Sequence, residues 1–104
     1  MARPFIVYIL HCSDASYYVG HTDDLEQRIA QHETGTLGYT ATRKPVKLVW
    51  FEEFPSREEA KAVELQIKNW NRRKKEALIA GKIVILRQAA RKNWARYRER
   101  RELK

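Results

Sequence analysis

FIVYILHC, residues 5–12, is followed by the turn residues SDAS, residues 13–16, and then by YYVGH, residues 17–21. The first run is rich in β-branched and aromatic residues and contains no glycine or proline, which predicts a strand. Both of its alternating faces are apolar, so we expect this strand to be covered on both sides. The loop is short enough to permit only a hairpin, so residues 17–21 are expected to form an antiparallel second strand.

The chain beyond the hairpin has the pattern of one further strand among helices. Thr22, Asp23 and Asp24 are N-cap candidates for a first helix that ends before Gly35. We expect this first helix to run to about residue 33, a loop over 34–44 and a strand over 46–54. Ser56 and Glu59 form a capping box that starts a long helix to about residue 71. A short helix over 72–80 and a last helix over 83–102 are expected to follow. The predicted class is therefore α/β, with a small three-stranded antiparallel sheet flanked by helices in the order β-β-α-β-α-α, followed by a basic C-terminal helix.

The size and composition exclude several classes of protein. A chain of 104 residues has the length of one domain. Cys12 is the single cysteine, which excludes an intrachain disulfide and any zinc site that needs two cysteine ligands. No apolar run approaches the ~20 residues of a membrane span, and the N-terminus has no apolar signal stretch. We therefore expect a cytoplasmic protein.

The net charge of +8 is unevenly distributed. Residues 1–67 hold 7 basic and 10 acidic residues, whereas residues 68–104 hold 14 basic and 3 acidic ones. The first part therefore carries −3 and the last part +11. Such an excess favours polyanions as partners, nucleic acid first and anionic membrane second. We expect a domain over residues 1–80 and a basic helical extension over residues 81–104.

Five polar or aromatic residues do not fit a plain hydrophobic core: Tyr8, Tyr18, Arg28, His32 and Glu64. Each also has an ordinary structural explanation. The two tyrosines could be core residues with the hydroxyl at the rim, and Arg28 with His32 could form a solvated helix face. Glu64 lies near the buried stripe of the long helix, where a carboxylate is rarely left without a partner or a metal.

The order and spacing of these residues favour a functional site. Ile6-Val7-Tyr8 is followed by Tyr18-Val19-Gly20, then by DLEQRIAQH over residues 24–32 and by Glu64 on the long helix. Over about residues 4–80 the chain resembles the GIY-YIG nuclease family. It is similar in particular to the small stand-alone bacterial, UPF0213-like members, most clearly over residues 52–79. Ile6 replaces the glycine of the first motif, and some branches carry lysine in place of His21 or tyrosine in place of His32.

The resemblance implies a metal-dependent endonuclease that hydrolyses phosphodiester bonds in DNA. It implies one Mg²⁺ or Mn²⁺ ion held by Glu64, Tyr8 as general base and Arg28 as the group that stabilises the phosphate. A phenol has an ordinary pKa of about 10, so we expect cationic neighbours to lower the pKa of Tyr8. His32 or His21 could pass a proton to or from Tyr8. Tyr18 would hydrogen-bond to phosphate or water.

Other functions remain open from the sequence. One alternative is a non-catalytic nucleic-acid-binding module that retains the fold, although the presence of Tyr8, Arg28 and Glu64 favours the enzyme. Another is a toxin-like or partner-binding basic protein. DNA is favoured over RNA as the partner, and no membrane association is expected because the apolar stripe of the C-terminal segment is narrow.

The basic C-terminal segment permits two interpretations. It could hold the phosphate backbone and stack on bases, or it could be a solvated helix that packs on the domain. The nucleic-acid-binding candidates are Arg87, Arg91, Lys92, Trp94, Arg96, Arg98, Arg100 and Arg101.

Overall fold

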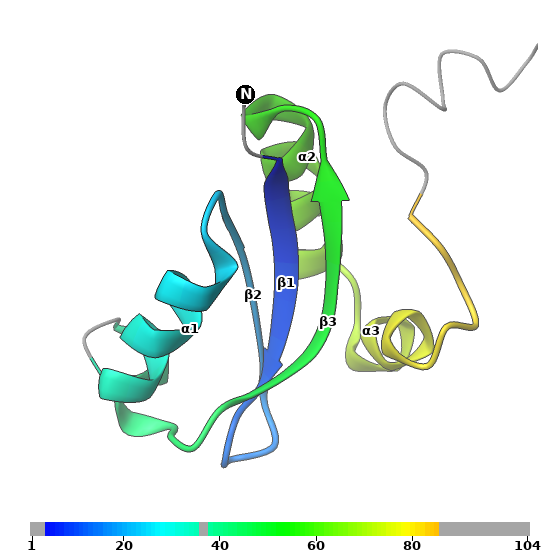
Figure 1. The fold of residues 1–104 in the computed structure, drawn as a ribbon. Coiled ribbons are helices and arrows are strands. Elements are labelled where there is room, and N and C mark those ends of the chain that lie inside the picture. The colour runs from blue at the N-terminus through cyan, green and yellow to red at the C-terminus, as the bar shows by residue number, and fades with distance from the viewer. Residues whose placement is uncertain (1–3, 36–37, 86–104) are drawn as a thin grey trace, which may run out of the picture.

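The computed structural model describes residues 4–35 and 38–85 (Figure 1). The expected order of strands and helices over residues 5–80 is confirmed. The elements are β1 (Phe5–His11), β2 (Tyr17–Thr22), α1 (Leu25–Thr34), a 3-10 helix η1 (Tyr39–Thr42), β3 (Lys47–Phe54), α2 (Arg57–Lys68) and α3 (Arg72–Ile79).

The sheet has the strand order β2-β1-β3, and both pairs are antiparallel. β1 is therefore the central strand. Both of its faces are apolar because both are covered. The four residues from Val7 to Leu10 have no exposed surface at all. In the register between β1 and β2, Val7 pairs with His21 and Tyr8 pairs with Gly20.

The main core lies between the sheet and α2, which runs across the back of the sheet in Figure 1. Val7 and Ile9 on β1 belong to one buried cluster with Val63 and Ile67 on α2. The capping box is confirmed, because Ser56 is the N-cap and its hydroxyl accepts a hydrogen bond from the Glu59 N–H. Since side chains alternate along a strand, Tyr8 and Gly20 lie on the opposite face from this core.

α1 lies beside the β2 edge of the sheet (Figure 1). Asp24 is its N-cap and accepts a hydrogen bond from the Gln27 N–H at 3.1 Å. Gly35 ends the helix with a φ of 79°, in the left-handed region that favours glycine. His32 is the buried residue of this helix, and α1 therefore places its imidazole against the sheet.

Two details of the expected helices were wrong. The segment predicted as a plain loop over 34–44 contains η1, which is too short to leave a periodic pattern in the sequence. The long helix ends at Lys68 rather than near Asn71. Asn71 instead caps α3, and its side chain accepts a hydrogen bond from the Lys74 N–H at 2.8 Å.

The described residues after Gly81, residues 82–85, are not helical. Residues 83–85, predicted as the start of the last helix, are not helical. Ile85 is buried and packs in the main core with Ile83 against it, because the apolar pattern here continues the domain. The remainder of that predicted helix, with all eight nucleic-acid-binding candidates between 87 and 101, lies outside the described residues. Within residues 4–35 and 38–85, no helix has both the length and the apolar character needed to cross a bilayer.

Candidate active site

Tyr8 is completely buried on the central strand. Its hydroxyl oxygen lies 2.9 Å from Nε2 of His32, which α1 supplies from 24 residues further along the chain. The phenol ring lies across Gly20, its partner on β2. A Cβ atom at Gly20 would come within 2.6 Å of the Tyr8 hydroxyl oxygen. Glycine is therefore required at this position for the ring to reach His32.

Tyr18 joins Tyr8 and His32 in one cluster of rings. Its ring centroid lies 6.2 Å from that of Tyr8 and 4.9 Å from that of His32, the latter in an edge-on arrangement. On the other side, Tyr18 lies 5.7 Å from Tyr39 of η1, whose surface is 41% exposed. The rings thus form a continuous line from the buried Tyr8 to the surface. Sequence reasoning missed Tyr39, because it lies in a segment without periodicity.

The second nitrogen of His32 also has a partner. Its Nδ1 atom lies 2.6 Å from the hydroxyl oxygen of Thr40 on η1, and both residues are completely buried. Tyr8, His32 and Thr40 therefore form an unbroken chain of polar contacts inside the protein. Thr40 was not among the predicted site residues, and a single threonine in a loop leaves no signal in the sequence.

The pKa of Tyr8 is raised well above its ordinary value, mainly because the phenol is buried and secondarily because of Tyr18. The expectation that cationic neighbours lower it was therefore wrong in the net direction. Arg28 does lower the pKa of Tyr8, through its charge and through hydrogen bonding to the phenol, but by less than burial raises it. Burial also lowers the pKa of His32, and the charge of Arg28 lowers it further. At neutral pH both Tyr8 and His32 are uncharged.

Glu64 lies on the α2 side of the sheet, together with His21. One carboxylate oxygen lies 3.0 Å from Nδ1 of His21, and the other lies 3.2 Å from the ammonium group of Lys68, one turn further along α2. The Glu64 side chain is 18% exposed. The carboxylate near the buried stripe thus has protein partners, as its position required. Lys68 was not predicted as part of the site.

The donors around Glu64 suit a hydrated Mg²⁺ rather than an ion enclosed by protein. Within the described ranges, no group of three or more histidine, cysteine or acidic residues gathers to form a metal cage. Mg²⁺ is commonly held by one or two carboxylates and keeps several waters. The partly exposed Glu64 carboxylate fits that donor set, provided that the Lys68 ammonium moves off the second oxygen.

The predicted residues therefore form two groups that meet at β2. Tyr8, Tyr18, Arg28 and His32 belong to one group, on the face away from α2. His21 and Glu64 belong to the other group, because His21 pairs with Val7 on the α2 face. The two groups influence each other electrostatically, since the charge of Glu64 contributes to the raised pKa of Tyr8.

The order and placement of these residues match a known family. The family model described as the GIY-YIG catalytic domain matches residues 4–77, which is most of the chain. The chain belongs to the GIY-YIG family. The resemblance drawn from the tyrosine motifs is confirmed, and so is the similarity to the small bacterial members.

GIY-YIG relatives match the chain over most of their length. UPF0213 protein BH0048 of Halalkalibacterium halodurans is 47% identical over 75 residues, which cover 71% of this chain and 80% of the relative. UPF0213 protein lmo0166 of Listeria monocytogenes is 45% identical over 79 residues, covering 75% of this chain and 88% of the relative. The name of neither relative states an activity.

Two solved structures share the GIY-YIG fold described above. The solution structure of UPF0213 protein BH0048 superposes with a TM-score of 0.52 at 45% identity, covering 76% of this chain and 85% of that one. The solution structure of protein EF2693 from E. faecalis gives a TM-score of 0.55 at 34% identity, covering 75% and 84%. The GIY-YIG domain is of a nuclease type, which suggests nucleic acid as the partner.

Proposed function

We propose that this protein is a metal-dependent endonuclease that hydrolyses phosphodiester bonds in DNA. The observation that carries the proposal is the contact between the Tyr8 hydroxyl and Nε2 of His32, at 2.9 Å inside the protein. A buried phenol joined to a neutral imidazole is an arrangement that can accept a proton from water. The distance between them is that of a hydrogen bond, so a proton can cross it directly.

The proton path follows from the two pKa directions. Because the pKa of Tyr8 is raised, little phenolate exists at neutral pH. Once the substrate and its attacking water reach this buried oxygen, the phenol oxygen takes a proton from the water as its own proton passes to Nε2 of His32. The water oxygen forms a bond to phosphorus, and the bond from phosphorus to the leaving oxygen breaks. His32 is the better of the two histidine candidates for this role, because His21 is engaged by Glu64.

The other residues act on the charge of the phosphate. Arg28 is permanently charged and already lies at the Tyr8 hydroxyl, so it would stabilise the negative charge that develops on the phosphate oxygens. Tyr18 lies between Tyr8 and the exposed Tyr39, where it would hydrogen-bond to a phosphate or water. Glu64 would hold the divalent ion, which supplies Lewis-acid polarisation of the phosphate and charge relief at the leaving oxygen when bound.

The proposal is tested by a cleavage panel with purified full-length protein. Duplex, single-stranded and branched DNA and a matched RNA are incubated with Mg²⁺, with Mn²⁺ and with EDTA. We expect cleavage of at least one DNA substrate, dependent on the metal, and weaker or no cleavage of RNA. Binding of DNA without cleavage under all conditions would overturn the enzyme in favour of a binding module that retains the fold. We further propose that the protein is located in the cytoplasm and acts on its substrate there.

The role of His32 predicts a particular pH dependence. Neutral His32 accepts a proton and protonated His32 cannot, so the cleavage rate should fall as the pH drops through the pKa of His32. Since burial lowers that pKa, the fall should lie below its ordinary value of about 6.5. Because the pKa of His32 is lower in the folded protein than in the unfolded chain, protonation of His32 also destabilises the fold. The contribution of neutral His32 to the free energy of unfolding is therefore complete above about pH 6.5 and is lost at lower pH.

Rate profiles between pH 4.5 and 9 would measure this dependence in the wild type and in two variants. His32→Gln should lower the rate and remove the acid limb. His11→Gln is the matched control, because His11 lies at the end of β1 beside Tyr17 and should keep the limb. An acid limb that persists unchanged in His32→Gln would contradict the proposed proton path.

A further inference from the structure

Thr40 occupies the far end of the buried chain of polar contacts, 2.6 Å from Nδ1 of His32. We propose that Thr40 is a positioning residue, which holds His32 in the tautomer that carries its hydrogen on Nδ1. That tautomer leaves Nε2 with a free lone pair toward Tyr8. The inference deepens the proposed function and rests on it for its catalytic meaning, although the tautomer itself can be observed without any activity.

The hydrogen-bonding capacity of Tyr8 decides between the two tautomers. A guanidinium can only donate hydrogen bonds, so Arg28, whose charge acts on Tyr8, cannot accept the hydroxyl hydrogen. The Tyr8 hydroxyl hydrogen then needs an acceptor of its own, since buried polar groups are rarely left unpaired. Nε2 of His32 is the acceptor that lies at hydrogen-bonding distance. If Nε2 carried the hydrogen, it would point a second donor at Tyr8, and the hydroxyl hydrogen would have no partner there.

The other ring nitrogen of His32, Nδ1, faces Thr40. With Nε2 unprotonated, a neutral imidazole must carry its hydrogen on Nδ1. The Thr40 hydroxyl oxygen accepts that hydrogen bond. Because Thr40 and His32 are both completely buried, bulk solvent does not reach their side chains to replace the contact. Loss of the hydroxyl would leave Nδ1–H unpaired, which favours the other tautomer and removes the acceptor for the Tyr8 proton.

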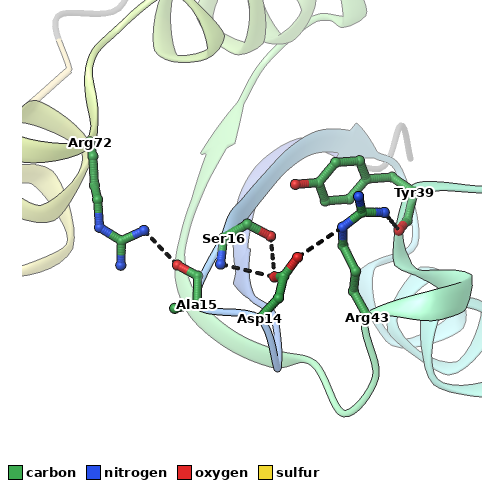
Figure 2. A network of polar contacts seen from close by, with 6 residues as sticks. All are labelled: Asp14, Ala15, Ser16, Tyr39, Arg43 and Arg72. Carbon is green, nitrogen blue, oxygen red and sulfur yellow. Dashed lines mark hydrogen bonds and ion pairs between the residues drawn. The ribbon is translucent and has the colours of Figure 1, made fainter.

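Arg43 connects η1, which carries Thr40, to the turn between β1 and β2 (Figure 2). We refer to this set of contacts as the clamp. The Nε of Arg43 donates to Asp14 at 3.0 Å, and its Nη1 donates to the Tyr39 carbonyl at 2.8 Å. Its backbone N–H donates to the Thr40 carbonyl, and its own carbonyl accepts from the Ser13 N–H, both at 3.0 Å. The guanidinium also stacks on the Tyr39 ring, 4.1 Å from the centroid.

A second arginine binds the same turn from the opposite side and provides a matched comparison. Arg72 at the start of α3 donates a hydrogen bond to the Ala15 carbonyl (Figure 2). Its guanidinium also stacks on the Tyr17 ring. Arg72 therefore resembles Arg43 in its contacts with the turn. Arg72 lies on α3, however, and its contacts are with Ala15, Tyr17 and Glu76 rather than with η1.

The experiment compares Thr40→Val, which keeps the shape and removes the hydroxyl, with Thr40→Ser, which keeps the hydroxyl. Long-range ¹H–¹⁵N NMR at pH 7.5 reports which nitrogen of His32 is protonated, with His32→Gln as the assignment control. We expect Nδ1–H in the wild type and in Thr40→Ser, and a shift to Nε2–H in Thr40→Val. The cleavage rate of Thr40→Val should fall by about 100-fold, the low end of what general base catalysis contributes, and Thr40→Ser should restore most of it.

The outcomes separate this inference from the proposed function. An Nε2–H tautomer in the wild type, or an unchanged Nδ1–H tautomer in folded Thr40→Val, would overturn the role of Thr40 even if the protein cleaves DNA. If the wild type cleaves nothing, the proposed function fails while the NMR result still decides the tautomer. Should Thr40→Val not fold, the wild-type tautomer and the pair Arg43→Ala and Arg72→Ala decide. Arg43→Ala should disturb the His32 nitrogen shifts, and Arg72→Ala should not; equal effects would contradict the clamp.

Discussion

Replacing Glu64 by glutamine is expected to lower metal-dependent DNA cleavage by about 1000-fold or more. Glutamine keeps the shape of the side chain and can still hydrogen-bond to His21, but it loses the negative charge that a divalent ion requires. A bound metal supplies several kcal/mol of stabilisation to the transition state. Since each ~1.4 kcal/mol corresponds to a tenfold change in rate, the loss of that contribution gives the expected magnitude.

Glu58→Gln is the matched control for Glu64→Gln, because Glu58 lies on the same helix α2 and is exposed. It should leave the cleavage rate within about twofold of the wild type, as is usual for surface substitutions. Binding of Mn²⁺ measured by electron paramagnetic resonance gives a second readout. We expect Glu64→Gln to weaken it and Glu58→Gln to leave it unchanged. Full cleavage by Glu64→Gln would exclude Glu64 as the residue that holds the metal.

Replacing Tyr8 by phenylalanine is expected to lower the cleavage rate by about 100- to 10,000-fold, the range that a positioned general base contributes. The ring still fits across Gly20, so the fold is retained. The lost hydroxyl leaves Nε2 of His32 without its partner inside the protein. An unsatisfied buried acceptor costs about 1–3 kcal/mol, so the variant should also unfold at a lower denaturant concentration.

Tyr17→Phe tests whether the Tyr8 effect is specific. Tyr17 is adjacent to Tyr18 but faces the other side of β2, where its hydroxyl donates to Glu76 at the surface at 3.2 Å. We expect nearly wild-type cleavage. The double variant of Tyr8→Phe with His32→Gln should be little slower than the slower single variant, because the two residues act as one unit. Fully multiplicative losses would argue against a shared proton path.

The parts of the fold that were predictable are those that depend on neighbouring residues. The caps at Asp24 and Ser56 and the glycine at the end of α1 act within one helical turn. The apolar character of both faces of β1 predicted that both faces are covered, because only a strand covered on both sides buries every side chain. η1 and the cap at Asn71 were missed, since short helices and single polar caps have weak local patterns.

The candidate site was only partly predictable for the same reason. Tyr8, Tyr18, Arg28, His32 and Glu64 could be chosen from residue type and spacing. Their partners could not, because Thr40 contacts His32 from the short helix η1 and Lys68 contacts Glu64 from an otherwise exposed position. Arg43 contacts Asp14 across 29 residues of sequence. Such contacts depend on where whole elements pack, and no local pattern records that.

The sequence by itself determined the order of the elements, the strand covered on both faces and the family, because these follow from alternation, capping and motif spacing along the chain. The tertiary structure alone decided the chemistry of Tyr8. A phenol has the same intrinsic acidity anywhere in a sequence, but burial against Tyr18 raises its pKa despite the charge of Arg28. The packing of α1 against the sheet gives the Tyr8 hydroxyl an acceptor, the imidazole of His32. The packing of η1 beside α1 places the Thr40 hydroxyl against the other nitrogen of that imidazole.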